Sequence, residues 1–152
     1  MSLPPTRLFL DTNVFIIGAA LPGSVEAAIL RWIGYGQPEP GPVSIVISSE
    51  LVEQILRVGR RLQGKDWGSQ IIHHIWNDLR CIYVILTEND YIVPGDVKIP
   101  REDIRIYMTA LNGEAECFVS SNHELIRVLA KQTGVFECLM PVDFVKKYLS
   151  GN

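Results

Sequence analysis

Short apolar runs that are typical of strands alternate along this chain with longer segments that have helical periodicity. Strands are predicted at Arg7–Leu10, Val43–Ser48, Cys81–Leu86, Ala115–Ser120 and Val135–Leu139. Helices are predicted at Ser24–Ile33, Ser49–Leu62, Trp67–Asp78, Arg101–Leu111, Asn122–Lys131 and Val142–Leu149. Strands that alternate with helices form βαβ units, which build a mainly parallel sheet covered by helices on both faces. We therefore expect a single α/β domain over residues 1–152, with about five strands in its sheet.

Composition narrows the classes of function. Apolar residues make up 47% of the chain and charged residues 20%, which is typical of a globular domain with a sizeable core. The net charge of −3 argues against a broad basic surface, although a local basic rim around an acidic site is compatible with it. Three cysteines without metal-like spacing indicate reduced thiols. Because we also find no signal peptide and no apolar run of ~18 residues, we expect a cytoplasmic protein.

The first predicted strand ends at an acidic residue. Leu8, Phe9 and Leu10 form the apolar run, Asp11 follows it, and Asn13 then suits the start of a helix. An acid at the carboxyl end of a parallel strand points into the crevice where open α/β sheets bind their ligands. The same position also suits an ordinary helix cap, so both roles remain open for Asp11.

A second acid, Asp103, opens the helix that follows Pro100. Acids in the first turn are favoured by the helix dipole, which would explain Asp103 without any function. However, Asp103 shares a helix face with the apolar residues Ile106 and Ala110. An acid at the start of a buried stripe lies at the edge of the sheet, close to the same crevice.

The helix after Ser48 and the strand before Asn122 add further polar candidates. Gln54 borders the apolar stripe of its helix, and Glu50 lies one turn earlier on the same side. Glu53 lies nearly opposite, where we expect it to be solvated and to pair with Arg57. Asn122 is an excellent helix cap, but its amide is also able to bind a metal ion or a ligand.

These stretches, in this order, resemble the PIN-domain family of metal-dependent ribonucleases. The motifs that carry the resemblance are Leu10-Asp11-Thr12-Asn13-Val14, Ser48–Val58, Asp103–Leu111 and Phe118–Leu125. The resemblance implies a three-layer α/β/α fold around a central parallel sheet. The family includes the VapC-like toxins of toxin–antitoxin pairs and enzymes of RNA processing and decay.

The resemblance also assigns roles to individual residues. Asp11 and Asp103 match the family's acids and are the expected ligands of one Mg²⁺ or Mn²⁺ ion. Two other acidic positions of the family are amides here, Gln54 and Asn122. The residues expected to carry catalysis are Asp11, Asp103, Glu50, Gln54 and Asn122. Glu50 is the candidate for a third carboxylate, and Asn13 and Ser120 are expected to orient the two aspartates.

Two functions follow from the resemblance. The first is a metal-dependent endoribonuclease of single-stranded RNA, acting as the toxin of a toxin–antitoxin pair, with an antitoxin partner and a homodimeric assembly. The second is a catalytically weakened PIN-like domain that binds RNA or protein, because two acids are replaced by amides. The candidate contacts to RNA are Arg57, Arg61, Arg101 and Arg105, although a solvated helix face is the alternative for the first two.

Overall fold

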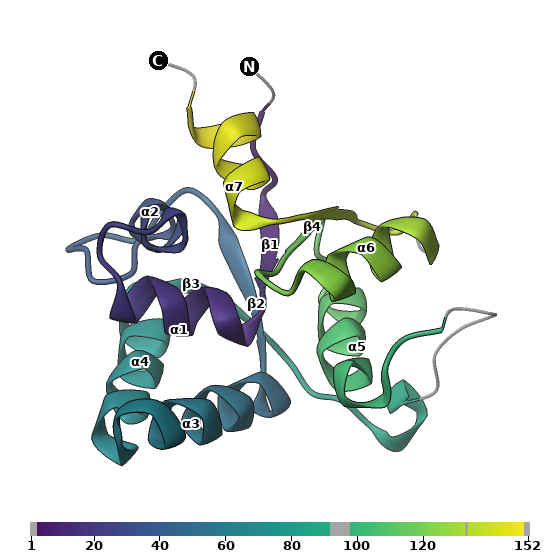
Figure 1. Cartoon of the computed structure of the whole chain (residues 1–152), viewed down its shortest axis with the longest axis horizontal. Coiled ribbons are helices and arrows are strands. Elements are labelled where there is room, and N and C mark those ends of the chain that lie inside the picture. The colour runs from purple at the N-terminus through teal and green to yellow at the C-terminus, as the bar shows by residue number, and fades with distance from the viewer. Residues whose placement is uncertain (1–2, 92–97, 133, 151–152) are drawn as a thin grey trace.

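A parallel sheet of five strands runs through the centre of the computed structural model, which describes residues 3–91, 98–132 and 134–150 (Figure 1). The strands are β1 (Arg7–Leu10), β2 (Ser44–Ser48), β3 (Arg80–Val84), β4 (Cys117–Val119) and β5 (Glu137–Leu139). Their order across the sheet is β3-β2-β1-β4-β5, and every neighbouring pair is parallel. The predicted sheet is confirmed, with each strand within a few residues of its expected position.

Helices connect the strands. The α-helices are α1 (Thr12–Ala20), α2 (Val25–Ile33), α3 (Ser49–Gln63), α4 (Lys65–Asp78), α5 (Ile104–Asn112), α6 (His123–Gln132) and α7 (Pro141–Phe144). Two 3₁₀ turns, η1 (Glu88–Tyr91) and η2 (Arg101–Asp103), precede α5, and the π-helical turn η3 (Val145–Leu149) extends α7. The helix predicted to begin at Arg101 therefore starts as a 3₁₀ turn and becomes α-helical only at Ile104.

The order in which the chain adds strands to the sheet explains why its helices form two layers. The connections β1-α1-α2-β2 and β2-α3-α4-β3 step toward one edge, whereas the path through α5 returns to β4 and the path through α6 continues to β5. Because crossovers between parallel strands are right-handed, the two directions place their helices on opposite faces. Figure 1 shows α1 to α4 together on one side and α5 and α6 on the other. The predicted three-layer α/β/α fold is confirmed.

The centre of the sheet is apolar on both faces. Leu8, Phe9 and Leu10 of β1 are fully buried, and the rings of Phe9 and Phe118 stack with centroids 4.8 Å apart. A parallel strand with helices on both faces needs such a continuous apolar run. Asp11 is the first polar residue beyond it, so the end of β1 is also the edge of the core.

No single helix in the described ranges is long and apolar enough to cross a membrane. The bent pair α1 and α2 has the length and apolar composition when both are counted together, with an angle of 101° between them. Much of this pair belongs to the core, since Val14, Phe15, Ile29 and Ile33 are fully buried.

Candidate functional site

Asp11 closes β1 and caps α1 at the same time. Its main-chain N–H continues the ladder with β4 by donating to the carbonyl of Val119 at 2.9 Å. One carboxylate oxygen, Oδ1, accepts from the N–H of Thr12 at 2.8 Å, and the other, Oδ2, accepts from the hydroxyl of Ser120 at 2.7 Å. The residue is 7% exposed. Capping and a place in the crevice are therefore both properties of Asp11, not alternatives.

Asn13 and Ser120 form a network around this carboxylate. The amide of Asn13 donates to the Ser120 hydroxyl at 3.3 Å and to Oδ2 of Asp11 at 3.5 Å. Its oxygen accepts from the N–H of Ser121 at 2.9 Å, and the Ser120 oxygen accepts from the N–H of Asn122 at 3.0 Å. Within the described ranges these hydrogen bonds reach Asp11 and none reaches Asp103. The two residues are therefore placed to orient one of the aspartates, whereas the sequence predicted that they orient both.

Asp103 approaches Asp11 from the start of α5. It is the last residue of η2 and the N-cap residue of α5, but its side chain makes no capping hydrogen bond. The pKa of Asp103 is raised to about 6, first by burial and then by the negative charges of Asp11 and Glu102. Burial also raises the pKa of Asp11, against the hydrogen bonds from Ser120 and Thr12. Each carboxylate is thus costly to ionise without a nearby cation.

The two aspartates share one cavity of about 240 Å³ with both amides predicted from the sequence. Its lining consists of Asp11, Thr12, Asn13, Ile16, Ile17, Gln54, Val58, Asp103 and Asn122. Thr12, which the sequence did not single out, donates its hydroxyl to Oε1 of Gln54. The oxygen of Asn122 accepts from the N–H of Leu125 at 3.1 Å and caps α6. Both amide oxygens are therefore engaged within the protein.

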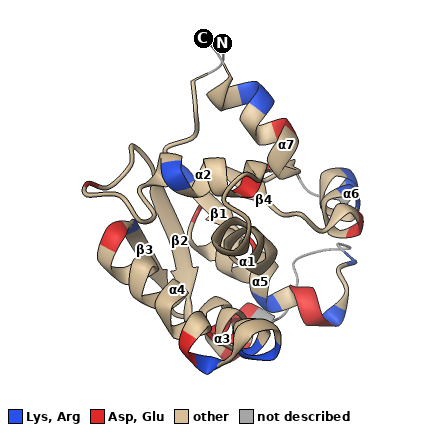
Figure 2. Cartoon of the chain, turned by 60° about the vertical axis from the view of Figure 1, so that its left-hand side comes forward, with Lys and Arg blue, Asp and Glu red and all other residues tan. Residues whose placement is uncertain are grey.

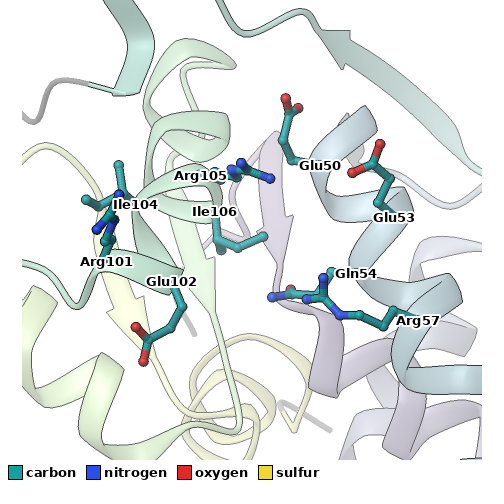
Figure 3. A pocket seen from close by; sticks show the side chains of 9 residues that line it. All are labelled: Glu50, Glu53, Gln54, Arg57, Arg101, Glu102, Ile104, Arg105 and Ile106. Atoms are coloured by element: carbon teal, nitrogen blue, oxygen red, sulfur yellow. The ribbon is translucent and has the colours of Figure 1, made fainter. Parts of the chain in front are cut away.

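A larger cleft of about 630 Å³ adjoins this cavity, and Gln54 lines both (Figure 3). The cleft is lined by Glu50, Glu53, Gln54, Arg57, Arg101, Glu102, Ile104, Arg105 and Ile106. These residues belong to α3, η2 and α5, and the hydroxyls of Ser48 and Thr109 link the start of α3 to α5 at 2.8 Å. Figure 2 shows the basic and acidic segments gathered along α3 and near the start of α5.

The cleft changes the roles expected for two glutamates. Glu50 lines the cleft and not the cavity of Asp11 and Asp103, so it does not join the two aspartates. In the part of the chain that the structure describes, no group of three or more His, Cys, Asp or Glu side chains is placed to hold a metal ion. Glu53 is exposed as predicted, and it also lines the cleft beside Glu50.

The arginines also divide into two groups. Arg57, Arg101 and Arg105 line the cleft, so they lie next to the cavity of the two aspartates. Arg61 is exposed one turn beyond Arg57 on α3 and does not belong to the lining. Side chains from α3, η2 and α5 therefore line one cleft of mixed charge. The spacing of residues along a single helix could not predict this arrangement.

The donor set of the cavity fits one hard divalent cation. Mg²⁺ in proteins is commonly held by one or two carboxylates, with water and substrate phosphate as the other ligands. Asp11 and Asp103 supply two carboxylates, and a cation between them would offset their mutual repulsion, which adds to burial in raising the pKa of Asp103. The lack of a third carboxylate among the described residues gives no basis for a second metal ion.

Solved structures with the same fold are VapBC assemblies. A chain of VapBC from Salmonella typhimurium, in a structure bound to DNA, has 13% sequence identity and a TM-score of 0.58, with 92% of this chain and 99% of that chain covered. A chain of VapBC-1 from nontypeable Haemophilus influenzae has 13% identity and a TM-score of 0.55 over 90% and 98% of the two chains. A chain of VapBC2 from Rickettsia felis, in a structure bound to a promoter DNA fragment, has 12% sequence identity and a TM-score of 0.54. The match covers 88% of this chain and 98% of that chain.

These likenesses establish the fold. VapC-like proteins belong to the family that the sequence resembles, so the PIN-like architecture predicted from the motifs is confirmed. No protein-family model matches the sequence, and no curated protein matches it.

Proposed function

We propose that this chain is a PIN-like, metal-dependent endoribonuclease that hydrolyses single-stranded RNA. The observation that carries the proposal is the meeting of Asp11 and Asp103 in one cavity at the carboxyl end of β1. Open α/β sheets bind their ligands at this end, and paired carboxylates there suit a divalent cation. Mg²⁺ or Mn²⁺ on the two aspartates would supply the positive charge that activates a water and stabilises the negative charge developing on the phosphate.

The residues of the cavity have separate tasks in this mechanism. Ser120 and Asn13 hold the Asp11 carboxylate in one orientation, so little reorganisation is needed when a cation binds. Asp103 has a pKa of about 6 and is mostly ionised at pH 7.5. In the overall reaction a water oxygen bonds to phosphorus while a P–O bond breaks, and the leaving oxygen takes up a proton.

The adjoining cleft is the proposed path for the RNA strand. Arg57, Arg101 and Arg105 line this path, and we propose that they contact phosphates on either side of the cleavage point. The three glutamates in the same lining balance the charge of these arginines. We therefore propose selective binding of modest affinity, with a weaker dependence on salt than a wholly basic groove would give.

The proposal includes a role as the toxin of a toxin–antitoxin pair. The solved structures that share the fold are VapBC assemblies, and this supports an antitoxin protein as the partner of this chain. A homodimer is expected from the family resemblance, and light scattering on the purified protein would test it. A cytoplasmic location is part of the same proposal.

Cleavage of an end-labelled single-stranded RNA tests the enzymatic proposal. We expect cleavage with Mg²⁺ or Mn²⁺, its loss in chelator, and a decrease of about hundredfold or more in Asp11→Asn and Asp103→Asn. Asp66→Asn is the matched control, because Asp66 is exposed in the first turn of α4, lies outside both linings, and should be dispensable for activity. Cleavage that survives both the chelator and the two aspartate variants would contradict the proposal.

The second candidate is a catalytically weakened domain that binds RNA or protein. Its support is the pair of amides, Gln54 and Asn122, beside the two carboxylates that the described residues bring to the cavity. Calorimetric titration with Mn²⁺ separates the two functions, since the nuclease requires the ion. Lack of binding at millimolar Mn²⁺ would favour the second candidate.

A further inference from the structure

Gln54 and Asn122 present the same chemical group to the cavity of Asp11 and Asp103. Oε1 of Gln54 accepts from Thr12, and Oδ1 of Asn122 accepts from the N–H of Leu125 at 3.1 Å. For the described residues, no hydrogen bond is made by Nε2 of Gln54 or Nδ2 of Asn122. Among the described residues, the two NH₂ groups are therefore the donors left for a ligand, beside one remaining lone pair on each oxygen.

A neutral amide binds a hard cation less strongly than a carboxylate does, because it brings no negative charge to the ion. It is a good donor to an anion. The cavity therefore combines two carboxylates, which favour a cation, with two neutral donors, which favour an acceptor. A single chemical class offers both parts at once, namely a phosphate oxygen next to a bound divalent cation.

Charge balance leads to the same ligand. Asp11 and Asp103 carry two negative charges, which one divalent cation neutralises. With acids in place of both amides the cavity would carry four negative charges, and a phosphate could approach only if more cations were bound. Amides remove that requirement, since they add hydrogen bonds without adding charge.

We infer that Gln54 and Asn122 bind a non-bridging oxygen of the substrate phosphate through their NH₂ groups, in a site that uses one metal ion. This inference rests on the proposed nuclease function and names how that site holds its substrate. The two amides are then substrate-binding residues, and they are not remnants of lost metal ligands. The site is expected to work with fewer cations and to depend on both amides.

Two substitutions isolate the NH₂ groups. Gln54→Glu keeps an oxygen that accepts from Thr12, and Asn122→Asp keeps an oxygen that caps α6 by accepting from Leu125. Each variant therefore preserves the hydrogen bond that the fold uses and replaces only the donor group by an anionic oxygen. Gln70→Glu on the exposed surface of α4 adds the same charge away from the cavity and serves as the control.

The experiment measures Mn²⁺ affinity by calorimetry and RNA affinity by fluorescence anisotropy at saturating Mn²⁺. The RNA is a labelled single-stranded 2′-O-methyl oligonucleotide, which keeps both phosphate oxygens, and a gel checks that it stays intact. We expect Gln54→Glu and Asn122→Asp each to weaken RNA binding by about tenfold or more. Mn²⁺ affinity should be unchanged or higher in both, and Gln70→Glu should match the unsubstituted protein in both measurements.

The outcomes separate this inference from the proposed function. If either variant binds both Mn²⁺ and RNA more tightly than the unsubstituted protein, the donor role of that amide is wrong. If the unsubstituted protein binds RNA with the expected dependence on the amides but cleaves none, the nuclease proposal fails and the inference stands. If it binds no RNA at saturating Mn²⁺, both are overturned.

Discussion

The cavity of Asp11 and Asp103 and the adjoining cleft are built from different kinds of side chain. Hydrogen bonds of the fold hold Asp11 and both amides of its cavity, and Ser120, which donates to Asp11, has 0% exposure. The cleft between α3 and α5 is formed by long, exposed, charged side chains such as Arg57 and Glu53. Gln54 is the residue that lines both.

The difference indicates that the side chains of the cavity need to be more rigid than those of the cleft. A cation site depends on the positions of its ligands. Buried hydrogen bonds hold those side chains in place before a cation binds, so binding costs little conformational entropy. An RNA path must follow a flexible strand, for which long side chains in solvent are suited. We therefore expect changes to the side chains that orient Asp11 to affect metal binding and stability together, and changes to the arginines of the cleft to affect RNA binding alone.

Ser120→Ala tests the cavity and should have the largest effect. It removes the hydroxyl that donates to Asp11 at 2.7 Å and accepts from Asn13 and from the N–H of Asn122. We expect Mn²⁺ affinity to fall about tenfold or more, and the free energy of unfolding to fall by about 1–2 kcal/mol. Calorimetry and urea denaturation measure the two quantities.

Ser121→Ala is the matched control for that experiment. The hydroxyl of Ser121 donates to Glu26 at 2.8 Å, away from the cavity, and its main-chain N–H still reaches Asn13. The control should keep the Mn²⁺ affinity of the unsubstituted protein. Equal losses in the two variants would contradict the division between a preorganised cavity and its surroundings.

Asp103→Asn tests the second carboxylate of the cavity in the metal-free protein. Folding raises the pKa of Asp103 from 3.8 to about 6, so the folded state binds this proton more tightly than the unfolded state. The stability that protonation provides is present at low pH and is lost as the pH rises through about 6. At pH 7.5 the substitution should therefore stabilise the metal-free protein by about 1 kcal/mol, after allowance for solvent screening.

Urea denaturation at several pH values checks this sign. The gain from Asp103→Asn should shrink below pH 6 and vanish well below pH 3.8, where the carboxyl group is protonated in both states. Asp90→Asn should act in the opposite direction at neutral pH, because hydrogen bonds from Thr87 lower the pKa of Asp90. A loss of stability in Asp103→Asn at pH 7.5 would contradict this prediction, because it would show that the folded protein does not disfavour the charged form of Asp103.

Much of the fold could be predicted because its signals are local. The apolar run of β1 must be buried, and Asp11 follows it, so the end of the strand and the acid were both readable from the sequence. The helix start at Asp103 was also predicted from local signals, namely Pro100 and the helical spacing of the residues that follow. The 3₁₀ turn that precedes α5 was not predicted, since it depends on how the chain enters the helix.

The hydrogen-bond partners within the site could not be predicted from spacing. Thr12 engages Gln54 across 42 positions of sequence, and Ser120 engages Asp11 across 109. Glu53 was correctly expected on the exposed face of its helix, yet the approach of α5 turns that face into a cleft wall. Such contacts follow from packing between distant segments, which the periodicity of one helix does not contain.

Arg57→Ala tests the cleft and should have the smallest effect. Arg57 lines the cleft, whereas Arg61 lies one turn further along α3 and outside the lining. Removing one exposed cation that contacts a phosphate should weaken RNA binding about threefold and reduce the salt slope by about one, with no change in Mn²⁺ affinity. Arg61→Ala removes the same charge and should change neither quantity. If the two variants weaken RNA equally, the cleft acts only through net charge, and the contrast between a fixed cavity and a shaped RNA path would be lost.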